Sequence, residues 1–350
     1  RGLKQDMDFK TEIMEDDKVI IDDQFIGNLK GLRFEMDLKT GALETDIKSL
    51  KKAARQTVGP ELQKRIQFII DTGLIEIQDD FKIYWKKFPI AKLVAGKDYL
   101  NPDIFLIVDD ILENDDKQKL SEFIEKWIKE KINLVLKSLI DLKNLKESNS
   151  SIKALAYQLY EGNGVIKREK VDDYLKKLGQ EERKILRELG VKFGRYHVFL
   201  FRLLKPEAVS LRILLWKNFH EKYFQLTPPT FGLNFLYNKN IKNKDFMLLC
   251  GFENFDNYFV RIDILERLFV QIINSNSDKD KEIKLVPEML NLLGCNKENF
   301  KKLIEKMGYK TYEKDADIYF KYFQKKIKKN FKKIDSSNSP FKVLKNLNFN

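Results

Sequence analysis

Residues 18–37 read KVIIDDQFIGNLKGLRFEMD, and this stretch decides the fold of the N-terminal part of the chain. β-Branched and aromatic residues are common in it, while Asp22-Asp23 and Gly31 are typical of turns. We therefore predict short strands joined by hairpins over these residues.

The period of the apolar residues changes after this stretch. From Leu43 to Ile69 they recur at steps of three and four, which predicts a long helix with one buried face. Gly59-Pro60 is expected to kink this helix or to restart it, because proline lacks the backbone donor that a helix interior needs.

The same succession then occurs a second time. Residues 75–108 are again β-rich, and a second helical stripe runs over residues 120–142. PIAKL at residues 89–93 echoes FIGNL at residues 25–29. This pattern indicates an internal duplication, and chance similarity of two β-then-helix units is the alternative.

The rest of the chain is predicted to be mainly helical, so the fold class is α+β. Gly179 and Gly190 are expected to close two helices in the left-handed C′ position. A small hairpin is predicted over residues 246–262. We place domains at residues 1–148 (duplicated units), 149–229 (helical), 230–334 (small α+β, with a basic tail helix) and 335–350 (C-terminal extension).

Two short helices at residues 287–293 and 297–307 form a helix-turn-helix outline. Gly294 is expected to end the first helix, and Asn296 is expected to cap the second. An ordinary αα-hairpin without a nucleic-acid role is the alternative interpretation.

The charge of the 350 residues is +12, from 65 basic and 53 acidic side chains. Of the basic residues 53 are Lys. Part of this bias is what an AT-rich genome would place at positions where the residue type does not matter, and it does not by itself indicate function. Eight of the 12 Arg lie between Arg168 and Arg267. In a Lys-biased chain, this concentration indicates positions where the planar guanidinium, which can donate two hydrogen bonds at once, is needed.

Several classes of site are excluded by their missing motifs. The chain has no GxxxxGK[ST], GxGxxG, GxSxG, HExxH or CxxC. Cys250 and Cys295 are the only cysteines, too few for a disulfide framework, so we expect a reduced, cytoplasmic location. No run of 18 apolar residues predicts a membrane-spanning helix. The chain begins with Arg1, from which we expect it to be part of a longer protein.

Residues 190–206, GVKFGRYHVFLFRLLKP, hold a basic and aromatic cluster between two glycines and an apolar run. We name Arg195, His197 and Lys205 as candidates for contacts with nucleic acid or with a motor domain. The alternative is a cluster that joins two elements of the fold, with His197 as a hydrogen-bonded structural residue.

The tail is the most biased segment of the chain. Residues 321–333, KYFQKKIKKNFKK, contain seven Lys and no acidic residue. Lys325, Lys326, Lys328 and Lys329 are candidates for phosphate contacts, and the interleaved rings could stack on bases. Ile318, Tyr322, Lys325 and Lys329 are also at helical spacing, so a basic amphipathic helix, solvated or at a membrane surface, is the alternative.

Six further blocks agree with the cluster at residues 190–206 in pointing to one family. These blocks are FIGNLKGLRF (25–34), AKLVAGKDYL (91–100), LRILLW (211–216), VRIDILERL (260–268), LLGCNKENFKKLIEKMGY (292–309) and SPFKVLKNL (339–347). In this order they resemble the C-terminal region of bacterial ATP-dependent helicases related to the mitochondrial degradosome RNA helicase. Members of that family typically read LGVRFGRYHVFLP, LLKP and LRALLW. Phe201-Arg202 departs from the pattern, where a proline followed by a small residue is expected.

The resemblance implies an accessory region of a helicase. RecA-like motor domains, with their ATP and Mg²⁺, would precede this region in the same polypeptide, and no catalytic residue or cofactor is expected in this chain. Partners would be single-stranded RNA or DNA, the motor domains and other RNA-processing proteins, but no membrane. The main alternative is a stand-alone structural or interaction protein, and a metal-dependent nuclease is the second.

Overall fold

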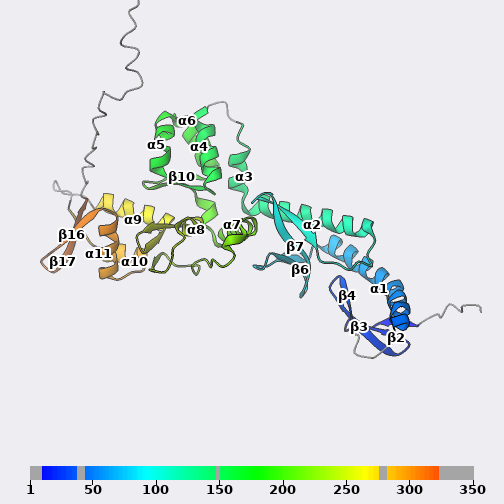
Figure 1. The fold of residues 1–350 in the computed structure, drawn as a ribbon. Helices are drawn as coiled ribbons and strands as arrows, with labels where there is room; N and C mark the ends of the chain where they lie inside the picture. The colour runs from blue at the N-terminus through cyan, green and yellow to red at the C-terminus, as the bar shows by residue number, and fades with distance from the viewer. Residues whose placement is uncertain (1–9, 38–43, 147–149, 276–281, 323–350) are drawn as a thin grey trace, which may run out of the picture. The chain divides into compact units, whose positions relative to one another are not determined.

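The computed structural model describes residues 10–37, 44–146, 150–275 and 282–322. The chain forms two compact units, residues 1–269 and residues 270–350 (Figure 1). Together the described residues have mixed α and β content, with sheets followed by helices, so the α+β class is confirmed. No helix in this part of the chain is both long and apolar enough to cross a membrane.

The predicted duplication is present within the first unit. Each copy has a four-stranded antiparallel sheet followed by a long helix. The sheets have the strand orders β1-β2-β3-β4 and β5-β6-β7-β8. The elements of the first copy are β1 (Thr11–Ile13), β2 (Lys18–Ile21), β3 (Gln24–Lys30), β4 (Arg33–Met36) and α1 (Glu44–Thr72). Those of the second are β5 (Ile75–Ile77), β6 (Lys82–Trp85), β7 (Phe88–Asp98), β8 (Asn101–Leu106) and α2 (Asn114–Val135).

The two sheets share one register, with each residue of the second 64 positions after its counterpart. Thr11 pairs with Ile21, and Ile75 pairs with Trp85. The register shifts at the same place in both sheets, between Val19 and Ile20 and between Ile83 and Tyr84. The turn hydrogen bonds also correspond, since the N–H of Met14 donates to Lys18 O and that of Gln78 donates to Lys82 O. This agreement in irregular features supports the duplication.

The last hairpin of each sheet differs in length. Leu29 pairs with Phe34 across four intervening residues, whereas Leu93 pairs with Ile104 across ten. The six additional residues lengthen the β7–β8 hairpin. From this point the spacing is 70, so that Glu44 opens α1 and Asn114 opens α2. Buried residues correspond at this spacing as well. These pairs are Val58 and Ile128, Leu62 and Ile132, and Ile66 and Leu136, the last of which directly follows α2.

One hydrophobic core joins both copies to the following helices, as far as residue Leu215. It includes Leu29, Leu93, Leu155 and Leu200, all almost fully buried. The boundary that we predict at residues 148/149 therefore does not coincide with a division of this core. Helix α1 also runs as one element through Pro60, so the predicted restart at this proline is wrong.

The region after α2 is helical, as predicted, but contains a small sheet that the sequence did not reveal. Strands β9, β10 and β11 form an antiparallel sheet of order β10-β11-β9. Each has only three or four residues, too few for a visible alternation. The elements here are α3 (Lys137–Lys143), α4 (Ser150–Glu161), β9 (Val165–Lys167), α5 (Arg168–Lys177), α6 (Gln180–Glu188), β10 (Val191–Phe193), β11 (His197–Leu200), the 3₁₀ helices η1 (Phe201–Leu204) and η2 (Glu221–Tyr223), and α7 (Pro206–Phe219).

The two glycines that we expected to close helices behave differently. Gly190 has a φ of +93°, in the left-handed region, as predicted. Gly179 has a φ of −76° and stands at the N-cap of α6, so its predicted left-handed conformation is wrong.

The last sheet of the first unit has the order β12-β14-β13. The predicted hairpin is present but begins at Phe252, because Asn243 caps a short helix over the preceding residues by accepting a hydrogen bond from the N–H of Phe246. The elements are β12 (Phe235–Tyr237), α8 (Lys244–Leu249), β13 (Phe252–Phe255), β14 (Tyr258–Arg261) and α9 (Ile262–Asn274), which ends in the second unit.

The second unit contains the predicted helix pair and a three-stranded sheet of order β15-β17-β16. Gly294 has a φ of +69°, and the side chain of Asn296 accepts the N–H of Asn299, so both predicted caps are confirmed. Ile318 and Tyr322 lie in β17, so their predicted place on a helix is wrong. The elements are β15 (Ile283–Lys284), α10 (Pro287–Leu293), α11 (Lys297–Lys306), β16 (Tyr309–Lys314) and β17 (Asp317–Tyr322).

Candidate functional site

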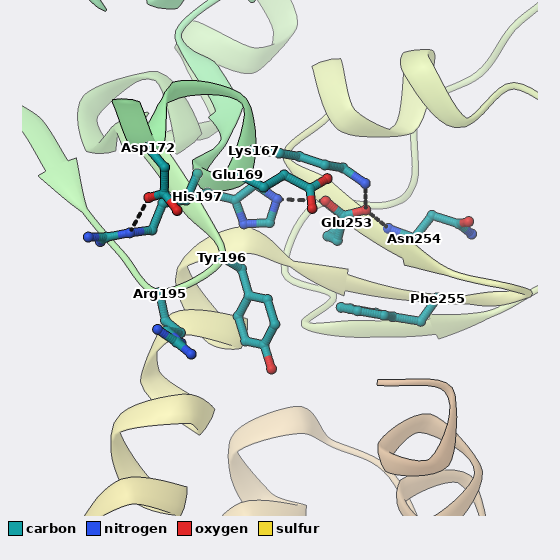
Figure 2. Close-up of a pocket in the computed structure, with 10 residues that line it drawn as sticks. Lys167, Glu169, Asp172, Arg195, Tyr196, His197, Glu253, Asn254 and Phe255 are labelled. Atoms are coloured by element: carbon teal, nitrogen blue, oxygen red, sulfur yellow. Dashed lines mark hydrogen bonds and ion pairs between the residues drawn. The ribbon is translucent and has the colours of Figure 1, made fainter. Parts of the chain in front are cut away.

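The basic and aromatic cluster predicted from the sequence lies at an open cavity of about 460 Å³, which we call the loop cavity. Three segments form its walls: the junction of β9 and α5, the loop between β10 and β11, and strand β13 (Figure 2). Its lining residues are Lys167, Arg168, Glu169, Asp172, Arg195, Tyr196, His197, Glu253, Asn254 and Phe255.

A glutamate on helix α9 holds the loop between β10 and β11. The carboxylate of Glu266 accepts hydrogen bonds from the backbone N–H groups of Arg195, Tyr196 and His197. A Cβ at Gly194 would lie 2.3 Å from Cδ of Glu266, so a larger residue here would displace the carboxylate from its three hydrogen bonds. The glycine before the basic and aromatic cluster is thus explained by the close approach of Glu266.

His197 lies inside the protein, with 1% of its surface exposed. Its Nε2 is 2.6 Å from Glu253 Oε2, and its Nδ1 is 3.6 Å from Glu266 Oε1. Burial of the ring opposes protonation, but the hydrogen bond to Glu253 and the charges of the two nearby carboxylates together outweigh it and raise the pKa of His197 above its ordinary value. The ring therefore connects β11 to β13 and to α9.

Glu253 is the centre of a small network of charges. Its Oε1 is 3.2 Å from Lys167 Nζ and accepts the N–H of Asn254 at 2.9 Å. Burial acts to raise the pKa of Glu253, but the hydrogen bond and charge of His197, the N–H of Asn254 and the charge of Lys167 together outweigh this effect, and the pKa lies below its ordinary value. Figure 2 shows Lys167, His197 and Asn254 converging on this carboxylate.

The cations of the loop cavity are largely engaged in contacts within the chain. Arg168 donates to Gly194 O at 2.8 Å, and its Nε is 3.4 Å from Asp172. Arg195 is exposed, with its guanidinium 5.4 Å from the ring centre of Phe269. Tyr196 lies edge-on to Phe255, with ring centres 6.4 Å apart.

The candidate residues of the sequence fall into three groups. Arg195 and His197 line the same cavity, and the burial and hydrogen bonds of His197 favour the structural alternative for that residue. Lys205 is exposed just before α7 and does not line the loop cavity. Lys325, Lys326, Lys328 and Lys329 lie outside the described residues.

The sequence analysis did not identify Lys167, Glu253 and Glu266 as site residues. The concentration of arginines in the sequence did indicate this part of the chain. In the structure, however, three of these arginines bond the backbone of the protein itself. Arg168, Arg183 and Arg212 donate to backbone carbonyl oxygens, those of Gly194, of Leu175 and Leu178, and of Asn163 and Leu203. Their planar, multiple donors serve the fold.

The arrangement is suited to holding a loop and presenting its exposed side chains. Both ring nitrogens of His197 face carboxylates, so this ring is not placed to exchange a proton with a ligand. Within the described ranges, no cluster of His, Cys, Asp and Glu could hold a metal ion.

Comparison of the chain with protein-family models, with curated proteins and with solved structures found no match to any of them. The likeness to bacterial helicases therefore rests on the sequence blocks described above.

Proposed function

We propose that this chain is the C-terminal accessory region of an ATP-dependent RNA helicase and that it binds nucleic acid. The motor, with its ATP and Mg²⁺, would be formed by RecA-like domains elsewhere in the same polypeptide. Other RNA-processing proteins are further candidate partners. We place the protein in the cytoplasm because its two cysteines are free thiols, with Cys250 buried.

The observation that carries the proposal is the order of elements from α9 to β17. Helix α9 is followed by a strand, two helices and two strands, and the sheet has the order β15-β17-β16. This is the order of a winged helix-turn-helix, in which the second helix of the pair is the one that contacts the nucleic acid. By this correspondence α11 would be the contact helix and the β16–β17 hairpin the wing.

The distribution of charge supports the same assignment. Residues 270–350 contain 18 Lys and 10 acidic residues, so this part holds +8 of the total +12. On α11, Lys297, Lys302 and Lys306 are exposed. Lys302 is paired with Glu298, which is also exposed, and such surface pairs cost little to exchange for a phosphate.

Binding of a single-stranded 20-mer RNA at several salt concentrations tests the proposal. The triple variant is Lys297→Gln, Lys302→Gln and Lys306→Gln. We expect it to make the negative slope of log K against log salt less steep by about 2, because each phosphate contact on a single strand contributes roughly 0.7. A matched control changes three exposed lysines of α2, Lys119→Gln, Lys126→Gln and Lys129→Gln, with the same loss of charge.

Equal slopes for the two triple variants would contradict the role of α11. The absence of RNA binding by the unmodified chain at the lowest salt would overturn the proposed function and favour the structural or interaction protein.

A further inference from the structure

Two adjoining cavities in the first unit, apart from the loop cavity, share the side chain of Tyr160; we call them the Tyr160 cavities. One measures about 270 Å³ and the other about 280 Å³. The first is lined by Asp98, Tyr99, Tyr160, Glu161, Asn163, Trp216, Phe219 and His220. The second is lined by Leu142, Lys143, Leu145, Lys153, Ala156, Tyr157 and Tyr160.

The lining of the two cavities is opposite in charge. The first combines the carboxylates of Asp98 and Glu161 with five aromatic rings, and the second contributes Lys143 and Lys153. The boundary between them is close, because Lys143 Nζ is 3.7 Å from Asp98 Oδ2 and 5.2 Å from the ring centre of Tyr160.

The first cavity is built where the two N-terminal copies differ. Asp98 and Tyr99 belong to the lengthened β7–β8 hairpin, which has no counterpart in the β3–β4 hairpin. They meet the C-terminal ends of α4 and α7, which provide Glu161 and Trp216. The additional six residues of the second copy thus supply one wall.

A buried arginine positions the remaining wall. The guanidinium of Arg212, which is fully buried, donates to Asn163 O and Leu203 O. It fixes the turn at Asn163, whose φ of +54° lies in the left-handed region. Arg212 is therefore a positioning residue for this cavity.

The walls of the first cavity also hold buried polar atoms that could accept or donate further hydrogen bonds. Within the described part of the chain, the hydroxyl of Tyr99 and Oδ1 of Asn163 are buried without a hydrogen-bond partner. Buried polar groups are normally satisfied, and each of these belongs to a side chain that lines the cavity. Both atoms are covered from solvent, so a ligand in the cavity bonds them only if the side chain turns toward it.

We propose that the Tyr160 cavities bind one nucleotide unit, with the base in the first cavity and the phosphate at the lysines of the second. Aromatic rings stack on bases, and carboxylates accept hydrogen bonds from exocyclic amino groups. A simple cation would suit the first cavity alone, whereas the neighbouring lysines favour a ligand that is anionic at its other end. The inference rests on the proposed binding of nucleic acid and adds a base-selective site.

Mononucleotides and oligonucleotides test the site separately. By calorimetry we expect GMP, AMP and CMP, which carry exocyclic amino groups, to bind more tightly than UMP, which carries none. Glu161→Gln is expected to weaken binding of the amino-bearing nucleotides about tenfold, because it removes a charged hydrogen-bond acceptor. The matched control is Glu188→Gln on α6, which is also exposed but lines neither cavity.

The phosphate half has its own pair of variants. Lys153→Gln is expected to weaken GMP binding several-fold and to leave guanosine binding unchanged, whereas Lys170→Gln on α5 changes neither. With a single-stranded 12-mer, replacing the nucleotides by abasic ones is expected to weaken binding, which would extend the site from free nucleotides to the strand.

The inference is overturned if no mononucleotide binds, or if Glu161→Gln and Lys153→Gln behave like their controls. In that case, retained binding of the 12-mer leaves the proposed function standing. If instead the 12-mer fails to bind at low salt while GMP binds as described, the proposed function fails and the cavities remain a nucleotide site.

Discussion

In the loop cavity Lys167 and His197 are paired with Glu253, and Arg168 is paired with Asp172. The Tyr160 cavities differ, because Glu161 and Lys153 line separate cavities and only Asp98 and Lys143 are paired, at the boundary. Glu253 is in contact with Lys167 and His197, and Glu266 with three backbone N–H groups. Around Tyr160, the carboxylates line one cavity and the lysines the other. The comparison teaches that a conspicuous cluster in the sequence can stabilise the fold, while the proposed binding site is lined by residues that the sequence analysis did not name as site candidates.

The largest expected effect is the loss of the three hydrogen bonds by which Glu266 holds the loop between β10 and β11, next to the loop cavity. Glu266→Ala leaves three backbone donors without their acceptor, and we expect the free energy of unfolding to fall by about 3 kcal/mol. Urea unfolding measures the change. Glu161→Ala, in the first Tyr160 cavity, is expected to change stability by less than about 0.5 kcal/mol, because the residue is exposed.

Equal effects of Glu266→Ala and Glu161→Ala would remove the distinction between a structural and a binding cavity. Glu188→Ala, an exposed residue of α6, serves as the control for loss of a surface carboxylate.

The next effect concerns pH and the loop cavity alone. The pKa of His197 is raised in the folded protein, so its contribution to stability is complete below the ordinary value of 6.5 and is lost as the pH rises through the raised value. We expect the free energy of unfolding to decline over that range. Urea unfolding at a series of pH values from about 6 to about 9 checks this expectation.

The chain provides its own control for the pH experiment. His220 lines the first Tyr160 cavity, and burial lowers its pKa below the ordinary value of 6.5, so its titration affects stability below pH 6.5 and not over the range in which His197 acts. His197→Asn is expected to flatten the decline above pH 6.5, whereas His220→Asn is expected to leave it unchanged. A decline that persists in the His197 variant would assign the pH dependence to other groups.

The smallest expected effect lies in the Tyr160 cavities. Tyr99→Phe removes only a hydroxyl that has no partner within the described residues, so stability is expected to stay the same or to rise by up to about 1 kcal/mol. Thermal unfolding is sufficient to detect the sign. A loss of more than about 1 kcal/mol would mean that the hydroxyl is already bonded and not reserved for a ligand.

The sequence predicts the duplicated part of the fold well. Its period changes from strand to helix twice, and FIGNL and PIAKL stand 64 residues apart, which is the spacing of the two registers. Long stripes of apolar residues and turn signals at fixed places determine these elements, so local patterns are sufficient.

The remaining elements depend on contacts that local patterns do not contain. Strands β9 to β11 are too short to show a period, and β17 reads DIYFKY, which fits either a strand or one face of a helix. Glu266 is 69 to 71 residues from the loop that it clamps, and it is one of 53 acidic residues. No local signal selects it, and the same holds for the cavity walls that meet only in the folded chain.

Because the two N-terminal copies share one register, a segment of one copy can replace the corresponding segment of the other. Residues 30–33 close the short hairpin at the position where residues 94–103 form the long one, between paired residues that correspond one to one. A graft of the short segment into the second copy would preserve the strand pairing on both sides and remove Asp98 and Tyr99 together. The molecule can thus be returned to two matching hairpins, and any ligand that then no longer binds can be assigned to the segment by which the copies differ.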